Sequence, residues 1–204
     1  MLESVRKSLK QIAPKIIDSL LPAATHEEIE ELQSLIKSPL PSDLITLYKE
    51  TAGNDPESLG NFAYGVPFLN IQKLIDVLRG FDFEDDSNAL RFAEQGIRKE
   101  YTLSKSRIHI GDNWGNCVIS VDLNPNENGD YGQVILVDYE MHVALKLASS
   151  VGEYIINFES DLIAGKYGLA EDALDDGVHW LEPERAIDPC NWYNSPTWKY
   201  VKTS

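Results

Sequence analysis

Of the 204 residues in the chain, 43% are hydrophobic, 33 are acidic and 18 are basic, which gives a formal net charge of −15. A chain of this length is expected to form one domain with extensions, and its hydrophobic content suffices for a buried core. The charge argues against nucleic-acid binding, which depends on Lys and Arg neutralising phosphates, and it favours either a cationic partner or simply the solubility of an acidic cytosolic protein.

The first expected element is an amphipathic helix within residues 1–24. Apolar residues recur there every three or four positions with Lys and Arg between them, and Pro14 is expected to break or kink the helix. The interspersed charges exclude a secretory signal peptide, and no run approaches the ~20 apolar residues of a membrane span. We expect the helix to pack on the domain, and lying on a membrane surface is the alternative.

The segment between this helix and residue 107 is predicted to be mostly helical. Capping residues, apolar spacing and helix-ending glycines indicate its elements. They are helices beginning near Thr25, Pro41 and Asn70, a short strand at 62–68, an acidic exposed loop at 82–86 and a weaker helix at 88–101.

A contiguous block of strands is predicted next. Alternating apolar residues separated by turn formers mark strands at 107–110, 116–123, 132–138 and 141–147. A helix follows, opened by Ser150 and Glu153. Because the strands form one block with helices before and after it, we predict an α+β fold with an antiparallel sheet of about four to six strands.

Residues 168–204 have a different character, first acidic and then aromatic. Seven acidic residues and one basic residue lie between 171 and 188, and Trp192 and Trp198 follow. We expect the aromatic cluster to dock on the domain and extend its core. The alternative is a segment that binds a partner or a second copy of the chain, so a homo-oligomer is possible.

The chemistry of the sequence points away from catalysis. There is no Gly-rich phosphate loop and no nucleophile elbow, and the histidines and cysteines lack metal spacing. The loop that begins at Asp122 resembles a calcium loop, but Glu127 and Gln133 occupy the positions that require Gly and Glu. We therefore expect no enzyme activity, no cofactor and no metal.

The two cysteines, Cys117 and Cys190, are far apart in the sequence. Cys117 lies on the predicted inward face of a strand, so a free buried thiol is favoured over a disulfide. Free thiols are typical of a reducing compartment, and we expect a cytoplasmic location.

The candidate partner-binding residues centre on the turn at 111–116. Exposed aromatic residues are enriched at binding hot spots, which favours Trp114, although its indole could instead fold over the sheet edge. Its polar neighbours are also ideal turn residues, Tyr64 either lines the same face or belongs to the core, and the acidic segment 171–188 is an alternative surface. The predicted contact residues are Tyr64, Asp85, Asp86, Asp112, Asn113, Trp114, Asn116, Asp122 and Asp130.

The order of these elements resembles the SUKH superfamily and, within it, the Smi/Knr branch of cell-wall-assembly regulators. The resemblance covers residues 25–167. It is carried by Leu40-Pro41 followed by Leu44, Leu47, Tyr48 and Gly53; Tyr64-Gly65; Ile110 to Asn116 with Asp122; Gly129 and Gly132-Gln133-Val134; Leu147 to Ser150 with Glu153-Tyr154; and Gly165-Lys166-Tyr167. The chain departs from the family where a strand often opens with an aromatic residue and this sequence has Arg107 or Ile108.

The resemblance implies a SUKH-like α+β domain that binds a protein without catalysis. Many bacterial members are immunity proteins that neutralise polymorphic toxins, often nucleases, so a basic toxin domain is the expected partner. Fungal members are longer scaffolds that regulate cell-wall synthesis, and a role of that kind is one alternative. A small-ligand-binding protein with a pocket near Trp114 is the other.

Overall fold

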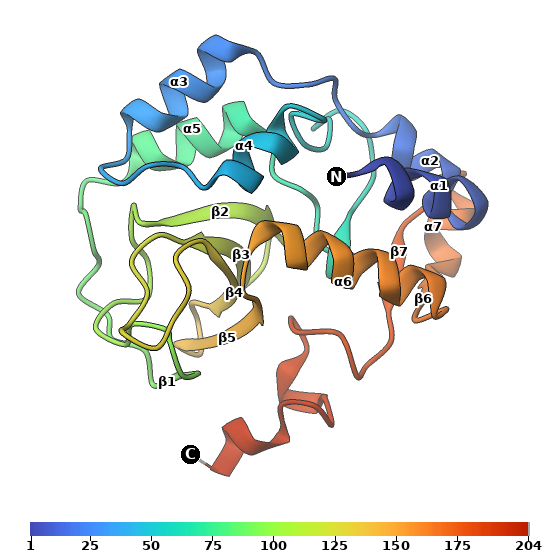
Figure 1. The fold of residues 1–204 in the computed structure, drawn as a ribbon. Coiled ribbons are helices and arrows are strands. Elements are labelled where there is room, and N and C mark those ends of the chain that lie inside the picture. The colour runs from blue at the N-terminus through green and yellow to red at the C-terminus, as the bar shows by residue number, and fades with distance from the viewer. Residues whose placement is uncertain (204) are drawn as a thin grey trace.

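The computed structural model describes residues 1–203, which fold as helices and loops around a central sheet (Figure 1). The helices are α1 (Glu3–Ile12), α2 (Pro14–Asp18), α3 (His26–Ser34), α4 (Ser42–Tyr48), α5 (Ile71–Gly80), α6 (Val151–Ile163) and α7 (Glu171–Asp175). The strands are β1 (Phe92–Ala93), β2 (Arg107–Asp112), β3 (Cys117–Asp122), β4 (Gln133–Asp138), β5 (Val143–Ala148), β6 (Tyr167–Leu169) and β7 (Leu181–Pro183). Short 3₁₀ turns are η1 (Ala63–Gly65), η2 (Trp192–Asn194) and η3 (Lys199–Thr203).

The central sheet has five strands in the order β1-β5-β4-β3-β2. Its four long strands are antiparallel neighbours, and the short β1 pairs parallel with β5. The predicted α+β fold with an antiparallel sheet is therefore confirmed, with the four predicted strands correct to within two residues at each end. A separate two-stranded sheet joins β6 and β7.

Each face of the central sheet is covered by a different layer. Ile119 and Leu136 belong to the large core on the side of α5 and α6. Val118 and Val137 belong to a second, smaller core with Leu90, which comes from the long loop between α5 and β2. Because both faces are covered, every residue of β3 and β4 is buried.

Side-chain caps begin the helices where the sequence predicted them. Thr25 and Glu28 form a complete capping box at α3. Asn70 accepts the Lys73 N–H at 2.8 Å at the start of α5, and the Ser150 hydroxyl accepts the Glu153 N–H at 3.1 Å at the start of α6. The predicted break in the N-terminal helix is also confirmed, because α2 starts anew at Pro14.

Two elements were predicted wrongly. Residues 62–68 contain the η1 turn instead of a strand, with Tyr64 in the left-handed conformation at φ 60°. Residues 88–101 form the short β1 and turns instead of a helix. At Gly96, φ is +91° and a Cβ atom would lie 2.8 Å from the Cα atom of Gly129, so tertiary contact with the β3–β4 loop has overridden the helical pattern.

The two ends of the chain pack against the same large core. In the N-terminal helix, Val5 and Leu9 are fully buried, and α1 contacts α6. Near the other end, Trp192 and Trp198 are 2% and 8% exposed, so the aromatic segment docks on the domain below the sheet in Figure 1. Among residues 1–203, no helix has both the length and the apolar character needed to cross a membrane.

Candidate functional site

The turn between β2 and β3 is held by its own side chains. Asp112 Oδ1 accepts the backbone N–H of Trp114 at 2.7 Å. Asn113 Oδ1 accepts the N–H groups of Gly115 and Cys117 at 3.0 and 2.9 Å. These polar groups are therefore used inside the turn, where they fix the backbone that carries Trp114.

Trp114 occupies an unusual backbone conformation. Its φ is 56°, in the left-handed region that costs a residue with a bulky side chain of order 1–3 kcal/mol. Its side chain is nevertheless 63% exposed, so no burial of the indole compensates for this strain. The turn thus holds a large aromatic side chain outward, which makes it the leading candidate for contact with a partner.

Trp114 forms part of the wall of a groove of about 740 Å³. The apolar wall also includes Leu59, which is 66% exposed, and Trp180. The segment between η1 and α5 lines the groove as well, through Pro67 and through Asn70, which caps α5. A groove of this size with aromatic walls is typical of binding sites.

The position of Trp180 is set by the segment that follows β6. Asn61 is fully buried, and its side chain bonds to both backbone groups of Leu181: Nδ2 donates to the carbonyl at 2.8 Å and Oδ1 accepts the N–H at 2.9 Å. This side chain therefore acts as a strand partner for the start of β7 and places the preceding Trp180 beside the groove.

Sequence reasoning missed both Leu59 and Trp180. Trp180 lies within residues 171–188, for which the sequence indicates an acidic surface. An aromatic residue among acidic ones is the signal that could have marked it. Leu59 lies in a loop and has no periodic pattern around it. Neither residue could be assigned to the turn at Trp114 before the fold showed which loops meet.

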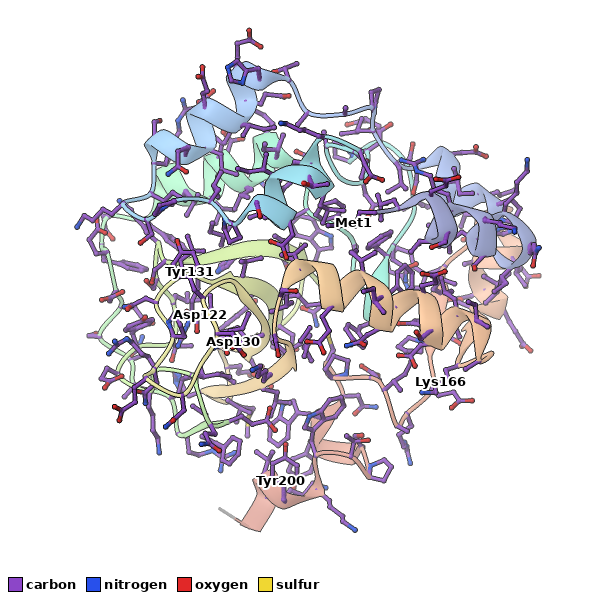
Figure 2. The ribbon with its side chains drawn as sticks, in the orientation of Figure 1. Met1, Asp122, Asp130, Tyr131, Lys166 and Tyr200 are labelled. Carbon is purple, nitrogen blue, oxygen red and sulfur yellow. The ribbon has the colours of Figure 1, made fainter. Side chains whose placement is uncertain are left out.

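The nine predicted contact residues do not form one surface. Trp114 lies just before the start of β3. Asp122 ends β3 and Asp130 lies beyond that end, and both are labelled in Figure 2. The six residues of β3 separate these ends by about 20 Å. Asp85 lies at the same end as Asp122 and Asp130, because its backbone forms an isolated β-bridge with Ser104, just before β2 begins.

Asp122 and Tyr64 are buried. Asp122 is fully covered, and its carboxylate accepts a hydrogen bond from the Gln133 amide at 3.0 Å and from the Asn124 N–H at 3.1 Å. Burial raises the pKa of Asp122. Tyr64 is 8% exposed, with its ring 5.7 Å from that of Tyr154, and burial raises its pKa too. Both side chains lie inside the domain in this structure.

Three further predicted residues are engaged within the chain. Asp86 is half-buried and accepts the Thr102 N–H at 2.8 Å, which corrects the expectation that it is exposed. Asp130 pairs with Lys146 at 2.7 Å, and this partner lowers the pKa of Asp130. Asn116 donates to Asp138, which also accepts the indole N–H of Trp192 at 2.9 Å, so Asn116 helps to hold the docked C-terminal segment.

The histidine and cysteine side chains show no clustered chemistry. In the part of the chain that the structure describes, no group of three or more His, Cys, Asp or Glu side chains is placed to hold a metal ion. His109 is buried, and burial together with the nearby Arg107 lowers its pKa to about 4. Cys117 and Cys190 are both free thiols.

The architecture defines an α+β domain, and its leading candidate site is the groove beside the turn between β2 and β3. The sequence profile of the SMI1 / KNR4 family (SUKH-1) matches residues 23–157, which is more than half of the chain. The chain therefore belongs to the SMI1 / KNR4 (SUKH-1) family, which confirms the resemblance.

Two fungal proteins are similar to a shorter stretch. The chain is 40% identical over 66 residues to the cell wall assembly regulator SMI1 of Saccharomyces cerevisiae, covering 32% of this chain and 13% of that protein. It is 38% identical over 66 residues to the KNR4/SMI1 homolog of Kluyveromyces lactis, covering 32% of this chain and 12% of that protein. The similarity thus spans a small part of each of these relatives.

Proposed function

We propose that the chain is a non-catalytic protein-binding module, and that it acts in the cytoplasm as an immunity protein that neutralises a bacterial polymorphic toxin. The observation that carries the proposal is Trp114, which is 63% exposed on a strained turn at the wall of a groove. A fold gains nothing from strain that exposes an indole, whereas a binding surface gains an anchor.

Three further features support this function. The formal charge of −15 would steer the protein towards a basic partner such as a toxin that binds nucleic acid. Membership of the SUKH-1 family agrees with a binding role without catalysis. The free thiols of Cys117 and Cys190 suit a reducing compartment.

A second candidate function is a regulatory scaffold for cell-wall synthesis. The 40% identity to the yeast cell wall assembly regulator favours it, although the match covers only 13% of that protein. A small-ligand-binding protein is the third candidate, favoured by a groove of about 740 Å³.

The proposal is tested by co-expression with toxins encoded beside this gene. We expect the wild-type chain to restore growth of bacteria that produce one of these toxins, and Trp114→Ala to lose that protection while it melts at an unchanged temperature. Ile163→Ala, which truncates an apolar side chain that is 70% exposed at the end of α6, is the matched control and should protect fully.

The other results overturn specific parts of the proposal. If the chain neutralises none of the neighbouring toxins, the immunity function is wrong. If Trp114→Ala protects as well as the wild type does, the chain is an immunity protein that uses another surface.

A further inference from the structure

The groove at Trp114 continues beyond its first chamber. A second recess is lined by residues of α7 and by Trp180 and Leu59, the same two side chains that form the wall of the first. The two hollows therefore adjoin along a shared apolar ridge, with Trp114 on one side of it and α7 on the other.

The charges along this double recess are nearly all negative. Lys73 is the basic residue that lines it in the described part of the chain. The acidic residues that line it are Asp55, Asp76, Asp172, Asp176 and Glu182. Within residues 1–203, none of these five carboxylates takes part in a salt bridge. A nearby cation, Lys15, donates to the carbonyl of Gly177 instead.

We infer that this double recess binds an arginine-bearing segment of a protein partner, with guanidinium groups stacked on Trp114 and Trp180 and paired with the carboxylates along its edges. Arginine fits this surface because its planar guanidinium group stacks on indole rings and pairs with carboxylates at the same time. This inference rests on the proposed function, since it names the chemistry of the partner at the same groove.

The second wall of the recess lies outside the part of the chain that matches the family. The family profile ends at residue 157, whereas Trp180 and α7 come later in the chain. Asn61, inside the matched part, fixes the start of β7 through the two hydrogen bonds to Leu181. The shared domain thus supplies Trp114, and the C-terminal segment adds a wall that distinguishes this chain's choice of partner.

The inference is tested with labelled peptides and the full-length chain. The probes are three fluorescein-labelled ten-residue peptides of alternating leucine and arginine, leucine and lysine, or leucine and glutamate, measured by fluorescence anisotropy at two salt concentrations. We expect the arginine peptide to bind more tightly than the lysine peptide, the glutamate peptide not to bind, and the affinity to fall as salt rises.

Variants locate the site. Trp180→Ala should weaken binding of the arginine peptide by about tenfold or more, as expected of a hot-spot residue. The double variant Asp76→Lys/Asp176→Lys should weaken it further. The double variant Asp82→Lys/Glu127→Lys changes the net charge equally at exposed positions away from the recess and should bind almost as the wild type does. Thermal melting verifies that each variant is folded.

Each outcome bears on one of the two proposals. Equal binding of the arginine and glutamate peptides, or equal loss of binding in the two charge variants, overturns the inference about the recess. If toxin neutralisation still depends on Trp114 in that case, the proposed function stands without it. If the arginine peptide binds as expected but no neighbouring toxin is neutralised, the recess is correctly described and the immunity function is wrong.

Discussion

The two ends of the central sheet use their polar residues in opposite ways. At the end where β3 passes into β4, Asp122 is fully buried and its carboxylate accepts a hydrogen bond from Gln133. Asp130, in the loop that follows, is paired with Lys146. At the other end, the side chains of Asp112 and Asn113 stabilise a strained turn that leaves Trp114 exposed. A polar loop alone therefore does not indicate binding, whereas the exposed indole on the strained turn has no role in the core that would account for it.

Arg107 is the central residue at the end of the sheet that carries Asp122. It is fully buried, and its guanidinium group donates to the carbonyls of Tyr101 and Thr102 at 2.7 and 2.8 Å and of Arg98 at 2.6 Å. The group also lies 4.4 Å from the centre of the Tyr101 ring. One side chain therefore fastens the long loop between α5 and β2 to the face of the sheet.

The largest expected effect is from Arg107→Met. The substitution leaves three buried carbonyls without their charged donor, so we expect the free energy of unfolding in urea to fall by about 4 kcal/mol. Arg91→Met, at an exposed position in the same loop, is the control and should change it by less than about 0.5 kcal/mol. Similar small losses for both variants would show that the loop is held to the sheet by its apolar contacts instead.

The second effect comes from pH and concerns His109, two residues along the same face of β2. Its Nε2 atom is buried without a hydrogen-bond partner within the described chain, and its pKa is lowered to about 4 from 6.5. The unfolded chain therefore binds a proton more readily. The stabilising contribution of neutral His109 is fully present above pH 6.5 and is lost as the pH falls towards 4. The loss in the free energy of unfolding through this group is about 3 kcal/mol in total.

His109→Leu isolates this contribution. Burial raises the pKa of Asp122 and Asp112, which acts in the opposite direction as the pH falls, so the quantity to measure is the difference between wild type and variant. We expect the wild type to lose more stability than the variant between pH 6.5 and pH 4 in urea titrations. Parallel pH profiles would mean that the pKa of His109 is the same in the folded and the unfolded protein.

The sequence predicts the structure correctly where local rules decide it. The strands β2 to β5 followed from alternation and turn formers, and the caps at Thr25 and Asn70 followed from residue type. It failed where distant segments meet. Asp122 precedes a polar loop and looks exposed in the sequence, yet the loop between α5 and β2 covers that face of the sheet.

The candidate site shows the same division. The sequence favours an exposed Trp114 and leaves open that its indole folds over the sheet edge, and the structure shows the side chain 63% exposed. The opposite wall, Trp180, required knowledge that β7 returns to Asn61, which lies far away in the chain. No local pattern in the sequence contains that contact.

At the turn between β2 and β3, the backbone strain can be tested with Trp114→Gly and Trp114→Ala. Glycine adopts a φ of 56° without steric cost, whereas alanine keeps the strain and loses the ring. We expect the free energy of unfolding of the glycine variant to be about 1 kcal/mol higher than that of the alanine variant. Both variants should bind a partner with a free energy weaker by about 2 kcal/mol. Urea unfolding and calorimetric titration with the partner measure the two quantities. A loss of stability greater in the glycine variant than in the alanine variant would mean that the turn is not strained at Trp114.

The smallest expected effect is from Asp85→Lys, at the end of the sheet that carries Asp122. Asp85 is exposed, but it lies at the end of the sheet opposite Trp114, beyond the screening length of roughly 8–10 Å at physiological salt. We therefore expect the association rate with a basic partner to fall by about twofold or less, and only at low salt, with no change in stability. Asp76→Lys, inside the groove, should slow association more at both salt concentrations. Stopped-flow measurements of both variants at about 50 and 150 mM salt compare the two ends directly. If Asp85→Lys slowed association as strongly as Asp76→Lys does, the partner would contact the acidic loop at 82–86, and the groove would lose its place as the main binding surface.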